Sequence, residues 1–308
     1  MLVLTIATGM FAHYANAEVY QWVDDKGKVH FGDRPPANAR TSANDLSARY
    51  ESEKPFNVEI IAHDYVLELD VKTKIEVAVA KIFTIYVDGL GLGFDGEAQL
   101  KIHIYGNEVA FRNLTRARGL QVENASGFYS PRENAIYVWR NRSLTRLLAV
   151  LTHEASHTIM RYQNGRVAAW INEGLAEYFE TMEVFGHTVV VHGNEHAADT
   201  VKELLETHRL PSLTEFIALP RSQWYAMNGE RGMSYAFGWS LCFYLMSSEQ
   251  GRATMAALLA RHREADFSSA GNELSLNVIE ANYPGGIRVL EQRWREWALY
   301  GKRVAHRY

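Results

Sequence analysis

The sequence has very little cysteine. Cys242 is the only one among 308 residues, so no disulfide can form within the chain. It stands in an apolar run, which predicts a buried packing residue. Long basic runs are also missing, and the net charge is −4. The sequence therefore lacks the clustered positive charge that is typical of nucleic-acid-binding proteins.

Long hydrophobic runs are missing as well. After the first residues, no stretch approaches the ~18 uninterrupted apolar residues that a membrane span needs, so we expect no span in the mature chain. Otherwise the composition is ordinary for a globular protein, with 47% hydrophobic and 22% charged residues. The length suits one large domain, or one medium domain with a small appendage.

The first 17 residues predict an export signal. Leu2 to Phe11 is apolar but too short to cross a bilayer, and Ala15-Asn16-Ala17 is a cleavage site of the small-x-small type. No Lys or Arg comes before Lys26, so the usual positive start is missing. Either the true start lies elsewhere or the signal is weak. We expect cleavage after Ala17 and a periplasmic or secreted protein.

Residues 18–36 predict a small β-hairpin module. Two β-rich runs flank the turn sequence Asp-Asp-Lys-Gly at 24–27. The pattern Tyr-x-Trp-x-Asp, then Gly, an aromatic residue and Asp-x-Pro-Pro resembles a module of unknown function found near the start of exported bacterial proteins. That resemblance implies an envelope location but no chemistry. Residues 37–55 are polar and predict a linker, after which the main domain is expected over 56–308.

The apolar spacing in the main domain predicts strands first and helices later. Extended segments are expected at 58–69, 98–105 and 135–139, with a helix at 71–87. Further helices are expected at 143–162, 168–182, 196–208, 233–248, 252–263 and 287–299. A capping box from Ser212 to Glu215 predicts the start of another short helix. This order predicts an α+β domain.

Residues 153–157 read His-Glu-Ala-Ser-His within the predicted helix 143–162. His153 and His157 are four residues apart, so they project from one helix face and can bind one metal ion. Glu154 points to the side, within reach of a water on that metal. Zinc lowers the pKa of such a water to about 7, and a carboxylate can take its proton during attack on a carbonyl.

A tetrahedral catalytic site needs a third protein ligand. The predicted helix at 168–182 offers two acidic residues one turn apart on the same face, Glu173 and Glu177. Glu173 is expected to supply the third ligand. Glu177 is expected to accept a hydrogen bond from the other ring nitrogen of a ligand histidine and so orient it. The pattern therefore predicts one zinc ion per chain.

Together these two segments resemble the gluzincin metallopeptidases, in which His-Glu-x-x-His is followed by a helix containing Asn-Glu-Gly. Residues 170–176 are similar to the aminopeptidase segment Trp-Leu-Asn-Glu-Gly-Phe-Ala, and bacterial peptidase-MA-like domains are the closest resemblance. A zincin-like fold over roughly 56–260, with Glu173 as zinc ligand and Glu177 beside it, is implied. Two features depart from the pattern. The gap between His157 and Glu173 is shorter than in many relatives, and the Gly-Ala-Met-Glu-Asn motif of aminopeptidases is absent.

The same resemblance suggests how a substrate would be held. Residues 232–240 are similar to a Tyr-Ala-x-x-Trp stretch of peptidase-MA-like chains, which makes Tyr235 the candidate oxyanion stabiliser. The alternative is a core tyrosine at the start of a helix. The strand at 135–139 is expected to form the cleft edge and bind substrate by β-augmentation, with residues 127–129 at its rim.

Several other histidines are not expected to bind metal or take part in catalysis. His187, His192 and His196 follow the second helix and are expected to be loop residues rather than a second metal site. His103 is expected at the surface of a strand. The basic tail at 303–308 is expected to be only solvated.

Three hypotheses follow. The leading one is zinc-dependent hydrolysis of a peptide or protein substrate in the bacterial envelope, with Glu154 as general base. The alternative is a non-catalytic envelope protein that uses the fold as a binding or structural module. The third is a coincidental histidine pair in a helical core. Glu154 favours the first, because a structural metal site has no need of a general base.

Overall fold

The computed structural model describes residues 20–23, 29–32, 56–93, 98–120, 125–140, 143–164, 167–227, 229, 232–265 and 273–308. The chain forms two compact units, Met1–Pro55 and Phe56–Tyr308. In the first unit β1 (Tyr20–Val23) pairs antiparallel with β2 (Val29–Gly32), so this part of the predicted hairpin is present. Its turn, the predicted signal peptide at 1–17 and the predicted linker at 37–55 lie outside the described residues.

The second unit begins with a four-stranded sheet in the order β3-β4-β6-β5. β3 (Phe56–His63), β4 (Ala98–Tyr105) and β6 (Ala135–Trp139) are parallel, while β5 (Gly127–Ser130) runs antiparallel to β6. Strand residues alternate between the two faces. One face therefore contributes apolar side chains to the main core, including Ile102, Ile104, Ile136 and Val138.

Two helices cover that core face, and a third covers the opposite face. α2 (Leu69–Thr84), continued by the π-helical turn η1 (Ile85–Gly89), packs against α4 (Leu144–Asn164) over the sheet. On the other face, α3 (Glu108–Ala117) lies over β4 and β6, where Phe111, Ala135 and Tyr137 form a second small core. The sheet is thus covered by helices on both faces.

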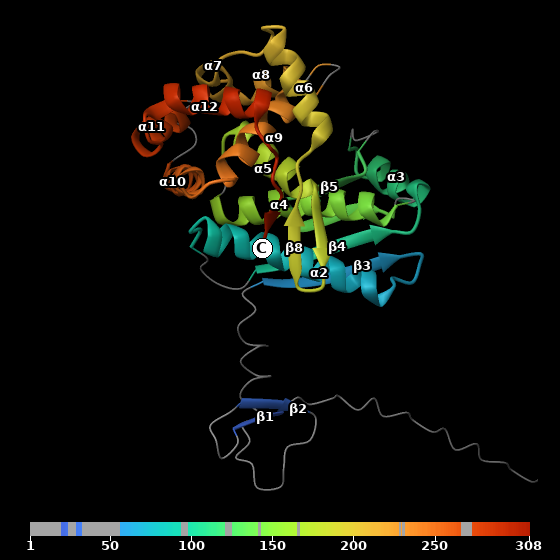
Figure 1. Ribbon diagram of the computed structural model, residues 1–308. Coiled ribbons are helices and arrows are strands. Elements are labelled where there is room, and N and C mark those ends of the chain that lie inside the picture. The colour runs from blue at the N-terminus through green and yellow to red at the C-terminus, as the bar shows by residue number, and fades with distance from the viewer. Residues whose placement is uncertain are drawn as a thin grey trace, which may run out of the picture. The chain divides into compact units, whose positions relative to one another are not determined.

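The later helices build on α4. α5 (Ala169–Glu180) packs between α4 and α9 (Met233–Met246) and is buried on nearly every side. In Figure 1, α4 lies between the sheet and these helices. The later part of the chain also forms the helices α6 (Glu195–Glu206), α7 (Leu213–Ile217), α8 (Arg221–Ala226), α10 (Glu249–Glu264), α11 (Glu273–Asn282) and α12 (Gly286–Tyr300).

The fold is α+β, as the sequence predicted. The capping box is also confirmed, because the Ser212 side chain accepts from the backbone of Glu215, whose carboxylate accepts in return from the Ser212 N–H. The extended segment predicted at 58–69 ends early. Asp64 adopts a positive φ of 62°, which breaks the strand, and α2 already starts at Leu69. None of the described helices is both long and apolar enough to cross a membrane.

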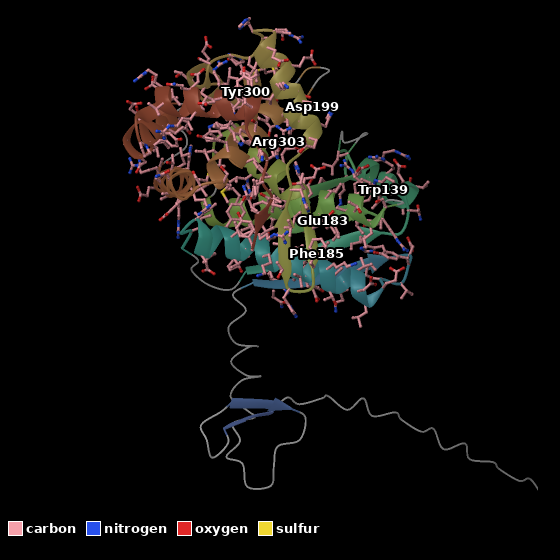
Figure 2. All side chains as sticks on the ribbon, viewed as in Figure 1. Trp139, Glu183, Phe185, Asp199, Tyr300 and Arg303 are labelled. Carbon is pink, nitrogen blue, oxygen red and sulfur yellow. The ribbon has the colours of Figure 1, made fainter. Side chains whose placement is uncertain are left out.

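The expectation of a merely solvated C-terminal tail was wrong. β9 (His306–Arg307) pairs with β8 (Thr188–Val191), which also pairs with β7 (Met182–Phe185). The Tyr178 hydroxyl on α5 lies 2.7 Å from Nδ1 of His306 and 2.8 Å from the Tyr308 hydroxyl. Figure 2 labels Arg303 at the start of this tail and Glu183 on the hairpin it joins. The tail therefore braces α5 through hydrogen bonds.

Candidate metal centre

Helix α4 presents His153 and His157 side by side. Their rings are nearly perpendicular, at 85°, and the two Nε2 atoms are 3.2 Å apart. Ala155 and Ser156, between them in sequence, are buried on the other side of the helix. The Ser156 hydroxyl there lies 2.8 Å from the hydroxyl of Tyr86 on η1. The back of α4 is thus fixed to the core while its front carries both histidines.

Helix α5 brings Glu173 to the same point. Its side chain is buried, and Oε2 lies 3.4 Å from Nε2 of His157 and 3.9 Å from Nε2 of His153. Burial alone would raise the pKa of Glu173. Hydrogen bonds and charge from His157, together with the Tyr225 hydroxyl, instead lower it to about 2. Glu173 is therefore an ionised acceptor facing both imidazoles.

These three side chains form a possible metal site. Bonds of about 2.1 Å in tetrahedral geometry place neighbouring donor atoms roughly 3.4 Å apart. The observed separations of 3.2, 3.4 and 3.9 Å need only a small adjustment to meet that requirement. Two imidazoles and a carboxylate are also the donor types that bind a small divalent cation at a catalytic centre. The residues present fit such an ion.

The surroundings of His153 favour the tautomer that a metal ligand needs. Its Nδ1 lies 3.3 Å from Oε2 of Glu180 and 3.8 Å from Oε1 of Glu177. Burial lowers the pKa of His153, but the bond to Glu180 and the charges of Glu154, Glu177 and Glu180 raise it to about 9. These carboxylates hold the proton on Nδ1, so a cation that displaces the other ring proton would meet the Nε2 lone pair.

Glu180 is a residue of the candidate site that the sequence analysis missed. It lies closer to His153 than Glu177 does, and it is itself bonded to Arg146 at 2.7 Å. Burial, and then the charge of Glu180, raise the pKa of Glu177 to about 7. Glu180 comes seven residues, or two helical turns, after Glu173, so helical spacing alone could have placed it on the same face of α5. The predicted partner Glu177 also lies near Nδ1 of His153, so two carboxylates, Glu177 and Glu180, can orient this histidine.

Tyr225 is the second missed residue. Its hydroxyl donates to Oε1 of Glu173 at 2.5 Å, and the Asn172 side-chain amide reaches the same oxygen at 3.0 Å. Tyr225 stands on α8, 52 residues after Glu173 in sequence. No local spacing connects the two, so the sequence offered no signal. These bonds hold one carboxylate oxygen and leave the other for the histidines.

A cleft of about 610 Å³ opens over the three ligands. Glu154 and Tyr235 both line it, so the structure brings the two predicted catalytic residues to the metal site. Burial and the charge of Glu173 raise the pKa of Tyr235, which keeps its hydroxyl protonated. Among the described residues that hydroxyl has no hydrogen-bond partner, so it remains able to donate to a ligand in the cleft.

The cleft edge is formed by β5, and the expectation that residues 135–139 form it was wrong. β6 lies inside the sheet, between β4 and β5, so both of its backbone edges are paired. Phe128 and Tyr129 of β5 line the cleft, as predicted for the rim. In the part of the chain that the structure describes, no strand pairs with the outer side of β5. That side can accept an extended peptide.

The remaining histidines lie away from this centre. His187 is in the turn between β7 and β8, His192 lies 3.2 Å from Oε2 of Glu183, and His196 is in the first turn of α6 rather than a loop. None of them belongs to a possible metal group among the described residues. His103 is half-buried rather than at the surface, with Nδ1 3.0 Å from Nε2 of His63.

Comparison with known families finds two matches. Residues 6–55 match a domain of unknown function (DUF4124), and residues 147–264 match a protein family of unknown function (DUF1570). The second match contains the three candidate metal ligands together with Glu154, Tyr225 and Tyr235, but not Phe128 and Tyr129 of β5, which line the same cleft. The chain matches no curated protein in sequence comparison.

Proposed function

We propose that the protein is a zinc-dependent hydrolase of peptide bonds, of the gluzincin type. The observation that carries this proposal is the convergence of His153, His157 and Glu173 in a cleft that Glu154 also lines. A structural zinc site is closed by a fourth protein ligand. The candidate site here has three protein ligands and opens into a cleft, which the Glu154 carboxylate also lines.

Each group has a defined task in that reaction. A bound zinc ion would supply a Lewis acid that polarises the carbonyl and acidifies water. Glu154 accepts the proton of the attacking water and passes it to the leaving amine. Tyr235 donates a hydrogen bond to the oxygen that becomes negative. The outer edge of β5 pairs with the extended substrate and fixes the bond to be cleaved over the site.

The metal is tested by measuring zinc per chain with elemental analysis. We expect about one zinc in the wild type, almost none in His157→Ala or Glu173→Ala, and substantial retention in Glu177→Ala, which lacks only an orienting group. His192→Ala is the matched control, because this histidine lies outside the centre. Equal retention in the Glu173 and Glu177 variants would contradict the ligand assignment.

Catalysis is tested with Glu154→Gln. This variant should keep its zinc but lose about 10²–10⁴-fold in the rate of cleavage of a peptide library, because the amide cannot accept the proton. Unchanged cleavage in this variant would rule out Glu154 as the base. A zinc-loaded wild type that cleaves no peptide would instead favour the non-catalytic alternative, in which the same fold only binds.

The location of the activity is part of the proposal. The signal-like residues 1–17 and the hairpin module favour action outside the cytoplasm, in the periplasm or beyond the cell. Fractionation of expressing bacteria, followed by N-terminal sequencing of the mature protein, tests this. A mature chain that begins at Glu18 is expected, and a full-length chain in the cytoplasm would contradict export.

A further inference from the structure

Two arginines line the metal cleft without a carboxylate partner. Arg161 and Arg221 both face it and are exposed. Within the described part of the chain neither forms an ion pair; the Arg221 guanidinium donates to the Tyr225 hydroxyl at 3.1 Å and lies over the ring of the same tyrosine, 5.4 Å from its centroid. Arg118 and Arg146, by contrast, are bonded to Glu133 and Glu180. The cleft therefore presents two guanidinium groups that form no ion pair with a described carboxylate.

Arg161 stands on the metal-binding face of α4. It follows His157 by four residues, so its Cα lies about 6 Å further along the helix axis on the same side. Burial raises the pKa of the Tyr129 hydroxyl on β5, and the nearby Arg161 charge opposes that rise. Arg161 thus lies where α4 faces the edge strand, beside the path of a peptide paired with β5.

Arg221 approaches from α8. Its Nη2 lies 3.1 Å from the Tyr225 hydroxyl, which lies 2.5 Å from Oε1 of Glu173, so the guanidinium is within about 5.6 Å of that carboxylate. Glu173 is already bonded to Tyr225 and faces His157, and its negative charge is compensated inside the site. The outward side of the Arg221 guanidinium remains available to a ligand.

Planar guanidinium groups match the two oxygens of a carboxylate. We propose that Arg161 and Arg221 select peptides that carry a carboxylate close to the bond being cleaved. The carboxylate belongs either to an acidic side chain or to a free C-terminus, since both present the same chemistry. This inference rests on the proposed peptidase function and adds a substrate class to it.

The test uses quenched-fluorescence octapeptides that differ only by Glu or Gln at each position in turn, with free or amidated C-termini. Zinc-loaded wild type should cleave the best Glu peptide with a kcat/KM about tenfold above its Gln counterpart. Faster cleavage of Glu than of Gln peptides identifies an acidic side chain as the recognised group, whereas faster cleavage of free than of amidated peptides, with Glu and Gln equal, identifies the C-terminus.

Arg161→Gln and Arg221→Gln should each reduce the ratio of acidic to neutral cleavage about fivefold, and salt should reduce it in the wild type. Arg288→Gln is the matched control, because this exposed arginine on α12 lies outside the cleft. Zinc per chain is measured in every variant, so that a loss of metal near Tyr225 is not mistaken for a loss of specificity.

A second readout does not depend on turnover. Fluorescence anisotropy of labelled Glu and Gln peptides with Glu154→Gln should show tighter binding of the acidic peptide, and adding either arginine substitution should remove the difference. Equal cleavage and equal binding both of Glu and Gln peptides and of free and amidated peptides would overturn the specificity proposal and leave the peptidase function standing. Absence of all cleavage together with an arginine-dependent binding difference would overturn the function alone.

Discussion

Glu173 has two different tasks for its two carboxylate oxygens. Oε1 is held by Tyr225 and Asn172, and Oε2 faces the histidines. A carboxylate fixed in this way loses little rotational freedom on binding a metal, so the partner of the ligand contributes to metal affinity. Spacing therefore predicted the candidate ligand Glu173 but not Tyr225, which holds it in position.

Tyr225→Phe should weaken zinc binding by about 10–100-fold while leaving the fold intact, because it removes only the hydroxyl that positions Glu173. Competition with a chelator measures the affinity. Tyr244→Phe is the matched control, since the Tyr244 hydroxyl bonds instead with that of Tyr283. An affinity equal to that of the wild type would show that Glu173 is positioned without Tyr225.

At the level of elements, the site depends on how closely α5 and α9 cross. A Cβ placed on Gly174 would lie 2.5 Å from the carbonyl oxygen of Gly238 and 2.7 Å from Sγ of Cys242. The glycine of the Asn-Glu-Gly segment therefore has a packing role. It lets α9 approach the helix that carries Glu173, and the buried Cys242 fills part of the same contact.

Gly174→Ala should lower the free energy of unfolding by about 1–3 kcal/mol or more, because backbone atoms of α9 would have to move. Urea unfolding measures this, and zinc content reports whether α5 has shifted. Gly89→Ala is the control: its added Cβ would meet only Ile85 Cγ2, at an ordinary 3.8 Å. Similar stability in both variants would contradict a tight crossing.

At the level of the whole molecule, buried histidines make stability sensitive to acid. Burial lowers the pKa of His262 to about 4, and burial with the charge of Arg252 does the same for His306. Both lie in the helical part or the docked tail, away from the metal ligands. Between pH 6.5 and pH 4 the unfolded chain therefore binds more protons at these positions than the folded chain does.

The free energy of unfolding should fall as the pH drops from 7 to 5, with a contribution from His262 of about 2 kcal/mol at most. His262→Gln should flatten that part of the pH profile, although the loss of the 3.0 Å contact with Ser275 lowers stability at pH 7. Thermal unfolding at both pH values measures the difference. A variant with an unchanged pH slope would exclude His262 as a source.

Sequence patterns predicted the regular elements where local periodicity is strong. The strands at 98–105 and 135–139 and the helices around 143–162 and 233–248 are present within a few residues of the prediction. The elements α3, α8 and β5 were missed; α8 and β5 have only six and four residues, so few residues carry each pattern. The prediction that β6 forms the cleft edge was wrong because the order of strands in a sheet depends on pairing between segments far apart in sequence.

The sequence by itself determined the local part of the centre. A spacing of four residues on a helix puts His153 and His157 on one face, and the same rule places Glu173, Glu177 and Glu180 along α5. Only the tertiary structure decided what meets these faces: Tyr225 against Glu173, Arg221 and the β5 edge at the cleft, and the C-terminal tail against α5. Helical periodicity is a property of neighbouring residues, whereas contacts between distant segments follow from how the core packs.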